Sequence, residues 1–143
     1  MKTKVTKSVF GGLAGTAALT MMMYFVAPMM LGQPMDIAAM LGSMMGGNWA
    51  LGMAAHWMNG VVIFPLIYAL VIYKLLPGSP VVKGTIWGIV LWLIAQAMVM
   101  PMMGAGFFSS GAGGAMAVMA SLMGHVVYGA ILGTIAASPD TGH

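Results

Sequence analysis

The sequence predicts an all-α integral membrane protein, a single domain folded as a bundle of four transmembrane helices. Of its 143 residues, 61% are hydrophobic and only 5% are charged, whereas a soluble domain carries about 25% charged residues. Four stretches are long and apolar enough to span a bilayer, which takes about 20 residues. The chain has too little polar surface to coat a core in water, so the lipid bilayer is its expected surroundings.

Short segments rich in glycine, proline and serine separate the four predicted spans. The spans cover residues 8–31, 49–73, 83–103 and 115–137. The first span follows three lysines, as the apolar part of a signal peptide would. Its apolar run exceeds 20 residues and lacks a small-x-small cleavage site at the right distance, so we expect it to be retained as a helix. Because the four spans take up most of the chain, we expect a single bundle without a soluble domain.

All lysines fall on one side of this arrangement. They are Lys2, Lys4, Lys7, Lys74 and Lys83. Because lysine-rich segments stay in the cytoplasm, both termini are expected inside. On the opposite side, residues 34–45 are apolar but too short to span, and we expect a short helix in the membrane interface there.

Composition excludes several classes of function. The chain has no cysteine, which removes thiolate metal sites and cysteine nucleophiles. Its only carboxylates, Asp36 and Asp140, are far apart in the sequence, and acid–base catalysis needs titratable groups placed together. We therefore expect no enzymatic activity from the chain alone. Five lysines do not form the dense basic face that nucleic acid requires, so nucleic acid is not an expected partner.

The second half of the chain repeats features of the first. The matching motifs are Gly11-x-x-x-Gly15 with Gly84-x-x-x-Gly88, Pro28 with Pro101, and Gly52-x-x-x-His56-x-x-x-Gly60 with Ser121-x-x-x-His125-x-x-x-Gly129. We interpret the pattern as an internal duplication of a two-helix unit. Units inserted in the same orientation are related by an axis along the membrane normal, which would bring the two histidines to opposite walls of the bundle at similar depth.

His56 and His125 are therefore the candidate ligands for a cofactor or a metal. Small residues lie one turn before and after each histidine on the same helical face; they are Gly52, Gly60, Ser121 and Gly129. Such spacing would leave a flat slot beside each ring, which suits a b-type haem with two axial imidazoles. Alternatively, the small residues only let helices approach, and each histidine makes one hydrogen bond to a neighbouring helix.

Three more polar residues are expected at the same depth: Asn59, Gln96 and Tyr128. Asn59 and Tyr128 each follow a histidine by three residues, so they could orient the imidazoles or anchor haem propionates. Each could equally be an interhelical hydrogen bond worth about 1 kcal/mol.

Methionine is unusually frequent, with 19 residues. Thioethers are soft ligands that select Cu(I), so copper is the alternative metal. Methionine is also a pliable filler of apolar cores, and no repeated Met-x-x-Met spacing marks a ligand loop.

With its lysine-tipped N-terminus and glycine-rich helices, the whole chain resembles the small four-helix bacterial and archaeal inner-membrane proteins grouped in families of unknown function. The resemblance rests on length and hydropathy. It implies a prokaryotic cytoplasmic membrane and no specific activity.

Three functions are consistent with these patterns. The function we predict first is that of a small subunit of a respiratory or electron-transfer complex with one haem between His56 and His125, and the other two are alternatives. Another is a structural subunit without a cofactor, whose glycine-rich faces pack against other membrane subunits. The third is the handling of copper or a small solute, although no carboxylate within a span is available to couple transport to protons or sodium.

Overall fold

The computed structural model describes residues 2–137, and over that range the chain is helical without a strand. Asp140 lies outside the described residues. Four long helices, named helices I to IV here, are built from consecutive segments. Helix I comprises α1 (Lys2–Met21), η1 (Met22–Val26) and α2 (Ala27–Leu31). Helix II comprises α4 (Trp49–Met58), η2 (Asn59–Ile63), α5 (Phe64–Ile67), η3 (Tyr68–Ile72) and α6 (Tyr73–Leu75). Helix III comprises α7 (Pro80–Ile94), η4 (Ala95–Val99) and α8 (Met100–Met102), and helix IV is α9 (Gly114–Ala136). The segments η1 to η4 are π-helical.

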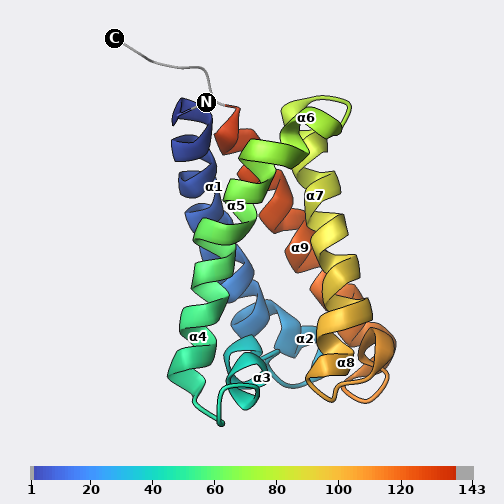
Figure 1. Cartoon of the computed structure of the whole chain (residues 1–143). Coiled ribbons are helices and arrows are strands. Elements are labelled where there is room, and N and C mark those ends of the chain that lie inside the picture. The colour runs from blue at the N-terminus through green and yellow to red at the C-terminus, as the bar shows by residue number, and fades with distance from the viewer. Residues whose placement is uncertain (1, 138–143) are drawn as a thin grey trace.

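The prediction of four apolar helices is confirmed, because helices I to IV are each long and apolar enough to cross a membrane. The start of α1, the α6–α7 connection and the end of α9 lie together at one end of the bundle (Figure 1). We call it the lysine end, since Lys4, Lys74 and Lys83 belong to these segments. The short helix α3 (Ile37–Ser43) and the 3-10 turn η5 (Phe107–Ser109) lie at the opposite end. The helix expected within residues 34–45 is thus present as α3.

Three of the π-helical segments stand at the same distance before a proline. Pro28, Pro65 and Pro101 are each the second residue after such a segment. A proline ring clashes with the carbonyl four residues earlier, and in each case that carbonyl belongs to the π segment. The wider turn absorbs the clash while the helix stays continuous.

Each proline also leaves one carbonyl without a donor, because proline has no N–H. In η2, the Phe64 N–H bonds the carbonyl of Asn59, and the next carbonyl, that of Gly60, would need the missing N–H of Pro65. The Tyr128 hydroxyl on helix IV donates to it instead at 2.6 Å. In η1 the carbonyl of Met23 is freed by Pro28 in the same way, and the Met35 N–H donates to it at 3.1 Å. The freed carbonyls thus tie distant segments together.

Helices III and IV pack backbone against backbone through glycines. A Cβ atom added at Gly84 would collide with the carbonyl oxygen of Gly129, and one at Gly129 with that of Gly84. Helices I and II approach similarly, since a Cβ at Gly12 would meet Pro65 and the carbonyl oxygen of Gly60. These glycines, which lie on the faces expected to dock partner subunits, thus make close contacts between helices of the bundle itself.

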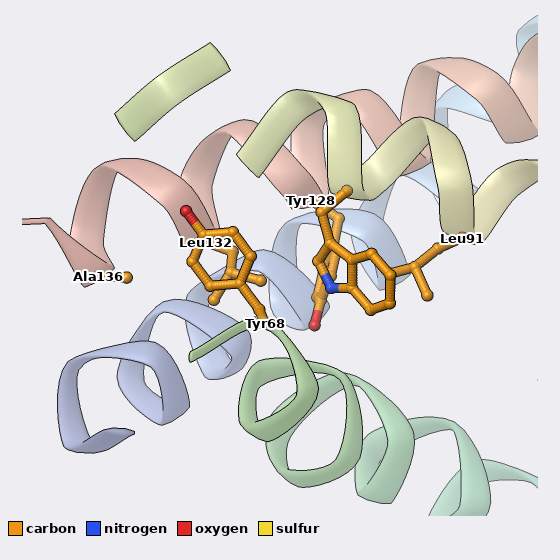
Figure 2. Close-up of a cluster of buried hydrophobic side chains, with 6 residues drawn as sticks. Tyr68, Leu91, Tyr128, Leu132 and Ala136 are labelled. Atoms are coloured by element: carbon orange, nitrogen blue, oxygen red, sulfur yellow. The ribbon is translucent and has the colours of Figure 1, made fainter. Parts of the chain in front are cut away.

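Large buried side chains fill the bundle between its middle and the lysine end (Figure 2). The cluster comprises Tyr68, Trp87, Leu91, Tyr128, Leu132 and Ala136. Its residues come from helices II, III and IV, so the cluster holds three helices together on this side. The remaining interior, toward α3, is less completely filled.

Candidate functional site

A cavity of about 260 Å³ reaches from the middle of the bundle to α3. Residues of all four long helices and of α3 line it, and three of the π-helical segments contribute to its wall. Six of the nine site residues predicted from the sequence line this one cavity: His56, Asn59, Gly60, Ser121, His125 and Tyr128. Because π-helical turns are frequently found at functional sites, their concentration here marks the cavity as the candidate site.

His56, on the last turn of α4, is buried and its imidazole is fixed by helix I. Its Nε2 atom lies 2.9 Å from the hydroxyl oxygen of Thr20, and that hydroxyl donates its only hydrogen to the carbonyl of Thr16 at 2.6 Å. The Thr20 oxygen must therefore accept a hydrogen bond from Nε2–H of His56. In a neutral imidazole the lone pair is then on Nδ1.

His125, on α9, has the opposite tautomer. Its Nδ1 atom lies 2.8 Å from the carbonyl oxygen of Ser121, which can only accept, so Nδ1 carries the hydrogen and Nε2 the lone pair. Within the described residues, neither Nε2 of His125 nor Nδ1 of His56 accepts a hydrogen bond. Metal-binding histidines commonly donate their second ring N–H to a carbonyl or a similar acceptor. Both histidines are oriented in that manner.

Thioether side chains make up a large part of the same wall. Seven methionines line the cavity: Met22, Met23, Met30, Met35, Met40, Met100 and Met123. Thioether sulfur and imidazole nitrogen together form a soft donor set, which suits Cu(I). Among residues 2–137, no group of three or more His, Cys, Asp or Glu side chains could hold a metal ion.

Three of the four small residues beside the histidines lie against neighbouring segments of the chain. Gly52 lies against the carbonyl of Ala38 in α3, and Gly60 against the side chain of Thr16. Gly129 lies against helix III, as described above. Neighbouring segments thus fill the spaces at these three glycines, whereas Ser121 lines the cavity. The cavity is smaller than the roughly 300–1,000 Å³ typical of pockets for drug-sized ligands. A b-type haem between His56 and His125 stays a prediction.

The part of the chain that contains the cavity residues matches a protein family. A family model with the description "Family of unknown function (DUF6789)" matches residues 2–141. The chain belongs to the DUF6789 family. No curated protein and no solved structure matches it. Both histidines and all seven cavity methionines of this DUF6789 protein lie inside the matched region.

Gln96, like Gly52 and Gly129, is a predicted site residue that does not line the cavity of the DUF6789 protein. It is fully buried in η4 and accepts a hydrogen bond of 2.7 Å from the hydroxyl of Ser109 in η5. It therefore fastens the connection between helices III and IV to helix III and does not line the cavity. Its Nε2 atom has no partner among the described residues.

Asp36 is a structural centre that the sequence analysis did not identify. Its carboxylate accepts hydrogen bonds from the Tyr24 hydroxyl at 2.7 Å, the Ala39 N–H at 3.0 Å and Trp49 Nε1 at 3.1 Å. It caps the N-terminus of α3 and joins that helix to helices I and II. Three residues of α3 line the cavity, namely Ile37, Met40 and Leu41. Asp36 therefore holds in place the helix that covers the cavity at this end.

The environment of Asp36 favours the charged carboxylate. Partial burial acts to raise its pKa, but the hydrogen bonds from Tyr24, Ala39 and Trp49 outweigh burial and hold the pKa of Asp36 below its ordinary value. A carboxyl group whose pKa is lower in the folded chain stabilises the fold above its unfolded pKa, and that contribution is lost as the pH falls through the folded pKa.

We therefore expect the contribution of Asp36 to stability, measured as the difference between the wild-type protein and Asp36→Ala, to be constant between pH 7 and about pH 5 and to fall below about pH 4. The Asp36→Ala variant loses the helix cap and is expected to be less stable at pH 7 by about 1–2 kcal/mol, and this difference should shrink in acid. Thermal unfolding in detergent, followed by circular dichroism across this pH range, measures both effects. An Asp36→Ala protein with the wild-type acid profile would show that another group is responsible.

Proposed function

We propose that this protein binds Cu(I) inside the membrane, in the cavity between helices I to IV, and handles copper without a catalytic step of its own. One observation carries the proposal. Among the described residues, His56 and His125 each have an unprotonated ring nitrogen that accepts no hydrogen bond, and both line a cavity whose wall contains seven methionines. Imidazole and thioether groups are ligands that Cu(I) prefers.

The apparent duplication supports a paired ligand set. The segment η1 begins at Met22 and η4 at Ala95, an offset of 73 residues that also relates Pro28 to Pro101. A duplicated two-helix unit would account for two histidines on two helices lining one cavity.

The distribution of lysines supports an orientation with the lysine end in the cytoplasm of a prokaryotic cell. The cavity reaches the opposite end, under α3, so copper would enter from the outer side. Large apolar side chains on the outside of the bundle, such as Phe25 and Met29, which is 84% exposed, are suited to contact with lipid.

A titration with Cu(I) tests the function. We expect the purified protein, kept anaerobic in detergent with ascorbate, to take one Cu(I) per chain from a chromogenic Cu(I) chelator. Ag(I), a soft ion of the same charge, should compete, whereas Zn(II), which favours nitrogen, thiolate and carboxylate ligands, should not. Failure to take Cu(I) even from a chelator of micromolar affinity would refute the proposal.

The same sample distinguishes the haem alternative. After expression with an adequate haem supply, the oxidised and dithionite-reduced protein should show no Soret band, because neighbouring segments occupy the spaces at Gly52, Gly60 and Gly129. A Soret band with sharp reduced α and β bands, lost in His125→Ala, would instead assign the histidines to a low-spin haem and favour an electron-transfer subunit.

A further inference from the structure

A second site, separate from the cavity, lies at the lysine end. The ammonium nitrogen of Lys4 lies 3.9 Å from the ring centroid of Tyr73, and that of Lys83 lies 4.0 Å from the same centroid. The two nitrogens are therefore no more than about 8 Å apart. Two ammonium groups thus contact the same aromatic ring. Each is attracted to the ring by a cation–π interaction, whereas the two positive charges repel each other.

Backbone carbonyls fix both lysines in this position. Lys4 Nζ donates to the carbonyl of Ala136 at 3.4 Å, and Lys83 Nζ donates to the carbonyl of Tyr73 at 3.0 Å. An ammonium group has three N–H donors, so each lysine has hydrogen-bonding capacity beyond these contacts. Within the described residues the lysine end contains no carboxylate, since Asp36 is at the opposite end of the bundle.

The position of the pair relative to the membrane suggests the anion. Lys4 begins one membrane span, Lys83 lies in the first turn of another, and Tyr73 is near the end of a third. The pair is therefore at the depth where the apolar helices end, which is where lipid phosphates lie. Basic pockets between transmembrane helices are known to bind the headgroups of anionic lipids.

The first turn of α7 adds to the positive potential. Ser79, at the N-cap of this 15-residue helix, makes no capping hydrogen bond with its side chain. The N–H groups that begin a helix have no partner within it, and the helix dipole is positive at that end. Lys83 projects from this turn. The helix end by itself is not a site, but it strengthens the attraction of the lysine pair for an anion.

We propose that Lys4 and Lys83, held on Tyr73, bind the phosphate of an anionic phospholipid headgroup. The site is independent of copper binding, because it shares no residue with the cavity. The phosphate oxygens would accept hydrogen bonds from both ammonium groups and offset their mutual repulsion. The phosphate-bound lysines would then link the beginnings of helices I and III and the ends of helices II and IV.

Native mass spectrometry of the detergent-purified protein with phosphatidylglycerol tests the site. We expect one tightly retained phosphatidylglycerol per chain, and at least tenfold weaker retention by the Lys4→Gln/Lys83→Gln double variant. Lys74→Gln is the matched control, because it removes a charge at the same end from a lysine that is not on the Tyr73 ring. Lys4→Arg/Lys83→Arg should retain the lipid, and circular dichroism checks that each variant is helical.

The comparison arms identify the source of the phosphate. Zwitterionic phosphatidylcholine should not be retained. Inorganic phosphate at millimolar concentration should displace phosphatidylglycerol only if the site recognises phosphate alone, which would overturn the assignment to a lipid. Equal losses in Lys74→Gln and in the double variant would also overturn it, because binding would then follow net charge. The assignment would also be overturned if phosphatidylglycerol were retained only by the Asp140→Asn variant, because Asp140 would then be the counter-ion of the two lysines.

Discussion

The His125→Ala variant is expected to bind Cu(I) at least about 100-fold more weakly than the wild-type protein, a loss of about 2.7 kcal/mol. The variant removes Nε2, the ring nitrogen whose lone pair has no donor within the described residues. The carbonyl of Ser121 then loses only a side-chain donor, so the helix should persist. His56→Ala is expected to behave similarly. Competition with a chromogenic chelator measures both affinities.

Variants around the ligands separate binding from packing. Thr20→Val removes the hydroxyl that fixes the tautomer of His56 and is expected to weaken Cu(I) binding by about 10–100-fold. Met23→Leu should also weaken binding, because Met23 is buried and lines the cavity, whereas Met29→Leu, on the lipid-facing surface of the same helix, should not. Wild-type affinity in a folded His56→Ala/His125→Ala double variant would show that copper binds elsewhere.

The Gly129→Val variant is expected to lose more than about 3 kcal/mol of stability. Gly129 lies against the carbonyl oxygen of Gly84, so even a Cβ atom would collide with backbone that cannot rotate away. Overpacking usually costs about 1–3 kcal/mol, and here two entire helices must move apart. Thermal unfolding in detergent, or a fluorescence pair placed on helices III and IV, measures the effect.

Ala115→Val provides the control for this prediction. It adds the same type of side chain to an exposed position on the same helix, and we expect no measurable change in unfolding. If Gly129→Val unfolded at the wild-type temperature, the backbone contact between helices III and IV would have to be wrong. Gly84→Ala should reproduce the loss in milder form from the opposite side of the contact.

The sequence was sufficient to predict the four helices and to associate the two histidines with each other. Hydropathy predicts four apolar helices because the bilayer imposes their length. The recurrence of a histidine between small residues suggested that His56 and His125 belong together, and both line one cavity. These features depend on short stretches of chain, so they can be read locally.

Features that depend on contacts between distant segments could not be predicted. A glycine four residues from a histidine indicates that something approaches the backbone, but not whether it is a ligand or a helix. For Gly52 it is the carbonyl of Ala38, since α3 folds back onto helix II. The role of Asp36 depends on the same return of the chain. The positions of Pro28, Pro65 and Pro101 were the local signal for the π turns that bring Met22 and Met23 to the cavity wall.

The hydrogen bond from Tyr128 to the carbonyl freed by Pro65 fixes how far helix IV is shifted along helix II. Smooth apolar helices with small residues at regular intervals can pack almost equally well after sliding by one turn, about 5.4 Å. Such a slide would leave the Gly60 carbonyl without a donor in an apolar medium, which is costly. A proline in helix II thus determines the height of His125 relative to His56, although it touches neither ring. In a chain with so few polar side chains, the alignment of the two rings depends on a backbone group.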